Sequence, residues 1–194
     1  MDRLVQIDQQ ISLWLNQHNP EALNGFWHVL SGIREWIPLY VLILAALIWR
    51  LGWKKGLVVI LTLALGVLIT DQIANLFKDG FMRLRPCRDP WMIASGVLCP
   101  DGIHGGLYGF FSGHASNAFG FAAGSWAGFQ LNDRKHHYGL YGCFIMLWAM
   151  LVSLSRTMLA AHYLGDILVG SLFGLTLGLV LAFAAHRLIV KANL

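Results

Sequence analysis

Five long apolar segments constrain the fold of this chain more than any other feature. Each is long enough, or nearly so, to cross a bilayer as a helix, which takes about 20 residues. Hydrophobic residues make up 57% of the sequence and charged residues only 12%, so a soluble domain of 194 residues could not bury this much apolar surface. The sequence therefore predicts one all-α domain, residues 1–194, that forms an integral membrane helical bundle. The expected spans are Trp36–Leu51, Gly56–Phe77, Ser112–Leu131, Tyr138–Leu154 and Tyr163–His186.

The residues that precede these spans are less apolar. The stretch "LVQIDQQISLWLNQHN" has apolar residues at helical spacing with polar residues between them, which is typical of an amphipathic helix at a membrane interface. Pro20 then precedes "ALNGFWHVLSGI", whose 12 residues suit an interfacial or re-entrant piece better than a full span. We expect five transmembrane helices behind an N-terminal amphipathic segment, and six spans are the alternative.

The basic residues predict the orientation of the bundle. If five spans alternate in direction, seven basic residues share one side of the membrane with a single acid, Asp133, and this side should be cytoplasmic. The opposite side should face the periplasm or the exterior of a bacterial inner (plasma) membrane. The seven basic residues are Arg50, Lys54, Lys55, Arg134, Lys135, Arg187 and Lys191.

Three polar clusters lie on the predicted outer side, each at the end of an apolar segment. Charged groups are costly at such places and usually mark function. The clusters are "KDGFMRLRP" with Lys78 and Arg85, "FSGHAS" with Ser112, Gly113 and His114, and "SRTMLAAHYLGD", which runs from Ser155 to Asp166.

Five residues of these clusters could bind an anion. Lys78, Arg85 and Arg156 supply three cations, and arginine binds phosphate oxygens through its planar fork. Ser112 and Gly113 begin a helix, where free backbone N–H groups and the helix dipole favour negative charge.

Three further residues could carry out chemistry on that anion. His162 and Asp166 are four residues apart and share one helical face, so the carboxylate could orient the imidazole and stabilise its cation. His114 is a second histidine that could protonate a leaving oxygen. Together they favour phosphoryl transfer through a phosphohistidine.

The three clusters resemble the signature of the type 2 phosphatidic acid phosphatase superfamily, KxxxxxxRP, PSGH and SRxxxxxHxxxD. The resemblance implies a membrane helical bundle that removes phosphate from lipids without a metal or another cofactor. By the resemblance, His162 is the nucleophile, Asp166 its partner and His114 the general acid. Phe111 stands where the motif has proline, so the motif does not define the loop that enters this helix. The phosphate-binding residues implied by the resemblance are Lys78, Arg85, Ser112, Gly113 and Arg156.

Two rows of small residues at every fourth position should support the site. Such rows allow close helix packing in lipid, so we expect the two helices to press together or against a common neighbour, which would fix the two histidines relative to each other. The rows are Ser112, Ser116, Gly120, Gly124 and Gly128, and Asp166, Gly170, Gly174 and Gly178.

Asp71, Asn75 and Ser155 are possible supporting residues outside the direct contacts. Asp71, Asn75 and Lys78 lie on one helical face. Asp71 could hold Lys78 through Asn75 or water, pair with an arginine, or only hydrogen-bond to a neighbouring helix.

Cys87 and Cys99 both lie on the predicted outer loop, where an oxidising compartment favours a disulfide between them. Two cysteines with His104 as the one candidate addition cannot complete a tetrahedral zinc site, so no metal is expected.

The sequence leaves the substrate open among three lipids. A polyprenyl diphosphate is weakly favoured over a phosphate of lipid A and phosphatidylglycerol phosphate, because the outer loop is short. An anion-binding membrane transporter or receptor without catalysis is the alternative, but it would need no oriented nucleophile. A soluble vanadate-dependent haloperoxidase disagrees with the composition, and the scattered net charge of +4 does not favour nucleic acid. The oligomeric state is not predicted.

Overall fold

The structure, a computed structural model, describes residues 2–100 and 106–194, and His104 lies outside these ranges. The described chain is helical, and its one extended pairing is an antiparallel bridge between Leu84 and Tyr108. The α-helices are α1 (Asp2–Gln17), α2 (Asn24–Ser31), α3 (Ile37–Leu51), α4 (Trp53–Phe81), α5 (Pro90–Ala94), α6 (Gly113–Asn132), α7 (Gly139–Met158) and α8 (Leu164–Lys191). Three short 3-10 helices complete the elements: η1 (Glu21–Leu23), η2 (Arg34–Trp36) and η3 (Pro86–Arg88).

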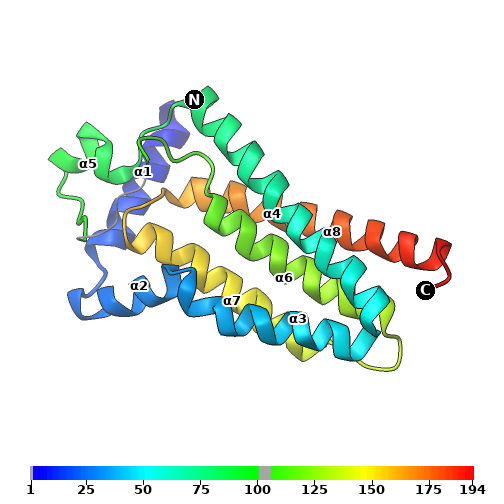
Figure 1. The fold of residues 1–194 in the computed structure, drawn as a ribbon. Helices are drawn as coiled ribbons and strands as arrows, with labels where there is room; N and C mark the ends of the chain where they lie inside the picture. The colour runs from blue at the N-terminus through cyan, green and yellow to red at the C-terminus, as the bar shows by residue number, and fades with distance from the viewer. Residues whose placement is uncertain (1, 101–105) are drawn as a thin grey trace.

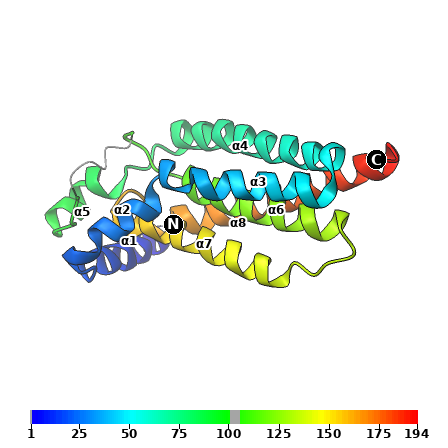
Figure 2. The same ribbon diagram turned by 60° about the horizontal axis from the view of Figure 1, so that its bottom comes forward.

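Five helices, α3, α4, α6, α7 and α8, form an elongated bundle, and α1, α2 and α5 gather at one end of it (Figures 1 and 2). The C-terminus lies at the other end. Helix α6 occupies the centre, where it packs on α3, α4, α7 and α8. Its small side chains, such as Ala115, Ala118 and Ala122, are buried, so the neighbouring helices can surround it closely.

Each predicted span corresponds to a helix of the bundle, which confirms the all-α membrane fold class. Among the described residues, α4, α7 and α8 are long and apolar enough to cross a membrane. The segments Glu21–Ser31 and Arg34–Leu51 meet the same criterion only as a pair bent by 63°, which describes a broken span or a re-entrant loop. The choice between five and six spans therefore stays a prediction.

Helices α6 and α8 are in backbone contact along the two rows of small residues. A Cβ atom built on Gly170 would lie 2.5 Å from the carbonyl oxygen of Ser112, and one on Gly174 would overlap the carbonyl of Ser116. The two helices therefore press directly on each other, the first of the two arrangements that the sequence allowed.

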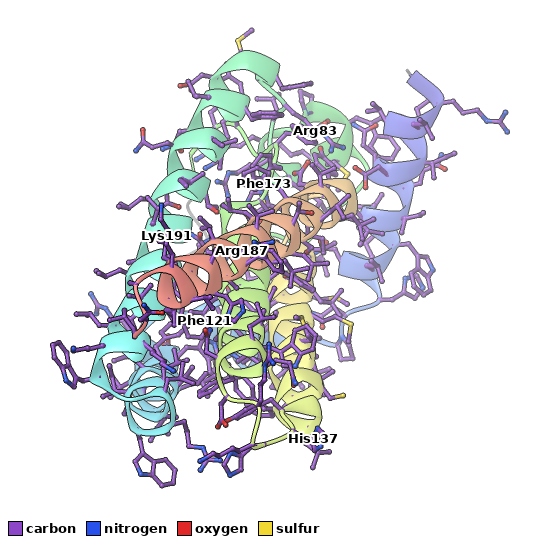
Figure 3. The ribbon with its side chains drawn as sticks, turned by 90° about the vertical axis from the view of Figure 1, so that its right-hand side faces the viewer. Arg83, Phe121, His137, Phe173, Arg187 and Lys191 are labelled. Atoms are coloured by element: carbon purple, nitrogen blue, oxygen red, sulfur yellow. A yellow bond between two sulfur atoms is a disulfide. The ribbon has the colours of Figure 1, made fainter. Side chains whose placement is uncertain are left out.

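Large apolar side chains cover the outside of the bundle. Leu61 and Leu68 of α4 and Leu172 of α8 are 59%, 62% and 66% exposed, as lipid-facing side chains would be. Figure 3 shows side chains projecting outward from the helices in one view, with Arg187 and Lys191 on the last turns of α8.

Helix α1 is amphipathic, and its polar face points inward. Ser12 and Asn16 are almost fully buried, whereas Leu4 and Trp14 are 76% and 57% exposed. Asn16 Nδ2 donates to the carbonyls of Leu98 and Met158, both at 2.9 Å. The helix therefore turns its apolar face outward, where a bilayer would meet it, and attaches to the bundle by hydrogen bonds.

The connection between α4 and α6 closes over the same end. Cys87 and Cys99 are joined by a disulfide with their Cα atoms 5.9 Å apart. The backbone N–H of Arg85 donates to Leu107 O at 3.1 Å, and that of Gly109 donates to Arg83 O at 2.9 Å. These contacts hold the first polar cluster of the sequence against the segment that leads into the second.

Candidate active site

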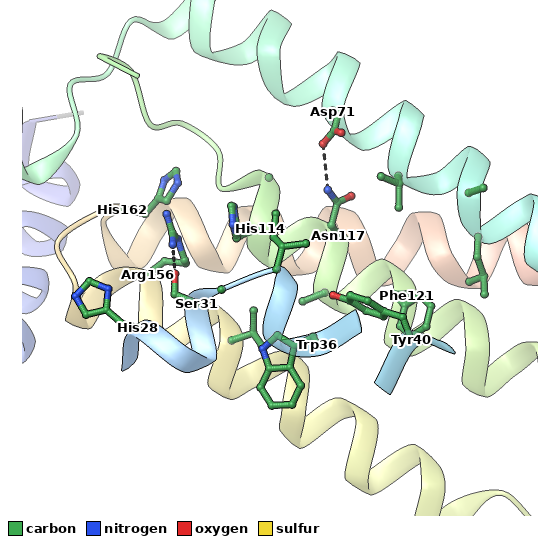
Figure 4. Close-up of a pocket in the computed structure, with 18 of the residues that line it drawn as sticks. His28, Ser31, Trp36, Tyr40, Asp71, His114, Asn117, Phe121, Arg156 and His162 are labelled. Atoms are coloured by element: carbon green, nitrogen blue, oxygen red, sulfur yellow. Dashed lines mark hydrogen bonds between the residues drawn. The ribbon is translucent and has the colours of Figure 1, made fainter. Parts of the chain in front are cut away.

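A cavity of about 870 Å³ lies between α2, α3, α4 and α6. One part is apolar and is lined by Trp36, Tyr40 and Leu44 on one side and by Leu63 and Val67 of α4 on the other. The other part is polar, and there His114, His162 and Arg156 gather around the open space (Figure 4). Of the eight predicted catalytic and phosphate-binding residues, six line the cavity: Lys78, Arg85, Gly113, His114, Arg156 and His162.

His162, just before α8, and Asp166, in the first turn of α8, form a buried pair. Their side chains are 3% and 0% exposed, and His162 Nδ1 lies 3.5 Å from Asp166 Oδ2, somewhat long for a hydrogen bond. This nitrogen has no hydrogen-bond partner among the residues described, whereas Asp166 Oδ2 also accepts from the backbone N–H of Tyr163 at 3.1 Å. Burial, partly opposed by Asp166, lowers the pKa of His162 to about 4, so the imidazole is neutral at pH 7.

Ser112 and Gly113 lie at the N-terminus of α6, as the sequence predicted. Ser112 is fully buried, and its Oγ accepts from the backbone N–H of Ala115 at 3.4 Å, so it caps the helix. Its own N–H donates to the backbone oxygen of Asp166 at 3.1 Å. Ser112 therefore ties α6 to α8 beside the two histidines, while Gly113 faces the cavity.

The two arginines reach the cavity from different elements. Arg85 is fixed by donation from Nε to Tyr108 O at 3.1 Å and from Nη1 to Ala161 O at 3.2 Å. Burial lowers its pKa from the ordinary value. Arg156, near the end of α7, donates from Nη1 to Ser31 Oγ of α2, and its buried Nε has no hydrogen-bond partner within the described chain.

The three expected supporting residues have different roles. Lys78 Nζ donates to Asn75 Oδ1 at 3.3 Å, within one helix. Asp71 Oδ1 instead accepts from Asn117 Nδ2 of α6 at 3.0 Å (Figure 4), which is the helix-to-helix hydrogen bond that the sequence left as one alternative. Ser155 Oγ donates to Val152 O at 2.6 Å and does not line the cavity.

A family model described as the PAP2 superfamily matches residues 55–189, which include every motif residue of the site. The chain belongs to this superfamily. PAP2 abbreviates type 2 phosphatidic acid phosphatase, the superfamily whose signature the three polar clusters resemble.

Two relatives of this PAP2 protein carry the name lipid A 4'-phosphatase. The first, from Bacteroides thetaiotaomicron, is 34% identical over 189 residues, which are 97% of this chain and 81% of the relative. The second, from Porphyromonas gingivalis, is 30% identical over 179 residues, 92% of this chain and 72% of the relative. The protein is therefore a membrane lipid phosphatase that hydrolyses a phosphoric monoester, and the alternative of a non-catalytic transporter or receptor is set aside.

The PAP2 fold is also seen in a solved structure. A transmembrane PAP2-type phosphatidylglycerolphosphate phosphatase from Bacillus subtilis superposes with a TM-score of 0.68 over 98% of this chain and 88% of that one. Because the two sequences are only 21% identical, this likeness extends to the fold alone.

Several residues near the site of this PAP2 protein are not among the fixed residues of the motifs, and sequence reasoning missed them. His28 and Ser31 of α2 line the cavity. A Cβ atom on Gly109 would lie 3.1 Å from Asp166 Oδ2 and 3.4 Å from His162 Nδ1, so this loop covers the pair. Arg83 forms ion pairs with Asp166 and with Asp8 of α1. Charge in the amphipathic segment was the one signal for Asp8, and nothing in the motif separates Arg83 from its neighbours.

Proposed function

We propose that the protein removes a phosphate from lipid A at the outer face of a bacterial inner membrane, by way of a phosphohistidine at His162. The substrate rests on the two lipid A 4'-phosphatase relatives, which align with almost the whole chain. They shift our preference from a polyprenyl diphosphate to lipid A. The observation that carries the mechanism is the polar part of the cavity, where three cations and two histidines line one space.

Lys78, Arg85 and Arg156 would bind the phosphate oxygens. Arginine donates in a planar fork that suits phosphate, and the Nε of Arg156 has no partner of its own among the described residues. The backbone N–H groups at the start of α6, at Gly113, would add partial positive charge.

His162 would attack phosphorus through Nε2, because Nδ1 faces Asp166. The neutral imidazole that its burial favours has the lone pair for this attack. As the N–P bond forms, the bond between phosphorus and the lipid oxygen breaks, and His114 donates a proton to that oxygen. Asp166 would orient the imidazole and stabilise the positive charge that it gains.

Water would complete the reaction. His114, now neutral, can take a proton from a water molecule that attacks the phosphohistidine, so that the N–P bond breaks and inorganic phosphate leaves. The two histidines thus have different duties: one forms a covalent bond and the other only moves protons.

The apolar part of the cavity would hold acyl chains. It continues from the polar part between η2 and α3 on one side and α4 on the other, with Trp36, Tyr40 and Val67 in its wall. A lipid phosphate lies at the membrane boundary while its chains lie in the hydrocarbon, and this cavity has the same sequence of polar and apolar surfaces.

The outward orientation rests on charge. The basic residues that predict a cytoplasmic side, such as Arg50, Lys55 and Lys135, line an open cleft formed by the ends of α3, α6 and α8. This is the end of the bundle away from α1, α2 and α5 (Figures 1 and 2), so the cavity opens on the other side of the membrane.

Phosphate release by the purified protein from lipid A, a polyprenyl diphosphate and phosphatidylglycerol phosphate tests the substrate. We expect the highest kcat/KM with lipid A, and a higher value with either other lipid would contradict this choice. His162→Ala and His114→Ala, compared on lipid A and on para-nitrophenyl phosphate, test the roles. His137→Ala is the matched control, because His137 is exposed and does not line the cavity.

The two variants should fail differently. His114→Ala should lower the rate on lipid A by about 10²–10⁴-fold and recover in part on the activated ester, whose leaving group needs no proton. His162→Ala should be inactive on both substrates and form no acid-labile phosphoprotein. A phosphohistidine in His162→Ala, or equal rescue of both variants, would show that the roles are wrongly assigned.

A further inference from the structure

The carboxylate of Asp166 has a cationic partner at a variable position of the first motif. Arg83 Nη1 donates to Asp166 Oδ1 at 2.7 Å. The other oxygen, Oδ2, accepts from the Tyr163 N–H and faces His162. With Oδ1 held by Arg83, the orientation of the carboxylate is set and Oδ2 stays turned towards the imidazole.

Arg83 is itself held by the N-terminal helix. Its Nη2 donates to Asp8 Oδ2 of α1 at 2.7 Å, and its guanidinium lies 4.0 Å from the ring centroid of Tyr163. Burial opposes the charge of Arg83, but Asp166 and Asp8 outweigh it and raise its pKa. Both Nη atoms of the Arg83 guanidinium are therefore hydrogen-bonded to carboxylates, and the group lies over the ring of Tyr163. Figure 3 shows Arg83 at the end of the bundle beside α1.

Helix α1 also completes the first turn of α8. The N–H of Leu164 donates to Ser12 Oγ at 2.8 Å, and that of Gly165 donates to Asp8 Oδ1 at 2.7 Å. The first N–H groups of a helix have no partner within it, so α1 supplies caps from a distant part of the chain. The turn that presents His162 and Asp166 is thus built against α1.

We propose that Arg83 is a positioning residue for Asp166 and that Asp8 of α1 holds Arg83 in place. This inference rests on the role proposed above for Asp166. Neither Arg83 nor Asp8 lines the cavity, so both act through Asp166 and not on the substrate. The chain Asp8–Arg83–Asp166–His162 joins an amphipathic helix that packs on the outside of the bundle to the nucleophile.

The test compares Arg83→Gln, Arg83→Lys and Asp8→Asn with the wild-type protein on lipid A. Arg83→Gln should lower kcat by about 10²-fold, as expected when a reacting group is misplaced by about 1 Å. KM should not change, because the cations of the cavity remain. Arg83→Lys should recover part of kcat because it keeps one charged donor. Asp8→Asn removes the anion but keeps an acceptor for the Gly165 N–H, so it should fold even where Arg83→Gln does not.

Gln17→Ala is the matched control on α1. Gln17 also ties this helix to the bundle, through Ser95 O at 2.8 Å and Gly96 O at 3.1 Å, but it touches no part of the chain to Asp166. Its kcat should equal that of the wild-type protein. An equal loss in Gln17→Ala and Asp8→Asn would mean that α1 acts only as a structural support, which would overturn the proposal.

Asp166→Asn separates this inference from the proposed function. If Asp166→Asn is fully active, the proposed role of Asp166 fails, and the inference fails with it. If Asp166→Asn loses activity but Asp8→Asn and Arg83→Gln do not, or if they raise KM alone, only the inference fails. If the inference holds, Arg83→Gln should cost little further activity in the Asp166→Asn background, because both substitutions break the same chain of contacts.

Discussion

Replacing Gly170 by alanine should displace His162 and Asp166 without touching either side chain. A Cβ atom at this position would lie 2.5 Å from the carbonyl oxygen of Ser112. Real Cβ atoms stay at least 3.0 Å from such an atom, so α6 and α8 must separate by about 0.5 Å or more. The obstacle is backbone, which cannot rotate away as a side chain can.

Two opposing effects decide the stability of Gly170→Ala. Alanine favours the helix over glycine by about 1 kcal/mol. Overpacking a tight interface typically costs about 1–3 kcal/mol. The cost of overpacking should exceed the gain in helix propensity, so the variant should be destabilised by up to about 2 kcal/mol, a loss that leaves it folded.

The effect on activity should be larger than this loss of stability suggests. Ser112 caps α6 and His114 lies in its first turn, while His162 precedes α8 and Asp166 lies in its first turn, one turn before Gly170. A separation of the two helices changes the distance between His162 and His114, which we propose to be the nucleophile and the general acid. We expect kcat for phosphate release from lipid A to fall about 10–100-fold, since a misplacement of 1 Å can cost about 10²-fold.

Two other glycines make this a graded experiment. Gly120 lies on the same interface, but a Cβ there would be 3.3 Å from Gly174 O, and a Cβ on Gly139 would meet nothing within 4 Å. The loss of kcat and of thermal stability should be large for Gly170→Ala, small for Gly120→Ala and absent for Gly139→Ala. If Gly170→Ala matches Gly139→Ala in both measurements, backbone contact between α6 and α8 does not position the site.

Four other outcomes are expected. Activity should persist in EDTA because lysine and arginine supply the positive charge, and loss of activity that added magnesium restores would contradict this. A membrane-impermeant maleimide should label Cys87 and Cys99 in intact cells only after reduction; labelling that requires permeabilised membranes would contradict the outward orientation. Leu44→Trp, in the apolar part of the cavity, should slow lipid A hydrolysis but not para-nitrophenyl phosphate hydrolysis. Because burial lowers the pKa of His162 from 6.5 to about 4, the unfolded chain binds the extra proton first as pH falls, so stability should drop between about pH 6.5 and 4. The melting temperature of His162→Gln should depend less on pH in this range than that of the wild-type protein.

Local patterns predicted the bundle because they depend on near neighbours in the sequence. The apolar runs gave α4, α7 and α8 to within a few residues at most ends. His162 and Asp166 approach to 3.5 Å, but the shared helical face predicted from their four-residue spacing was wrong, because α8 begins at Leu164 and His162 precedes it. The small-residue rows predicted close packing but could not select the partner, because a row of glycines does not encode what it touches.

Contacts between residues far apart in the sequence could not be predicted from local patterns. Asp71 bonds to Asn117 and Arg156 to Ser31, across 46 and 125 residues. The sequence marked Asp71 and Arg156 as costly in a membrane, but it did not name their partners, since a polar group needs only some partner of matching chemistry. The partner of Asp71 was therefore left open, with a hydrogen bond to a neighbouring helix as one alternative, and no partner was predicted for Arg156.

Helix α1 illustrates why a periodic pattern can predict an element and still miss its function. Alternating apolar and polar residues give the same helical period whichever face meets the protein. In a soluble protein the apolar face would be buried; here the surroundings of the bundle are themselves apolar, so that face can turn outward. Asp8 and Ser12 are then free to cap α8 and to hold Arg83. The membrane that requires the apolar runs thus also allows a polar helix face to become part of the support for the active site.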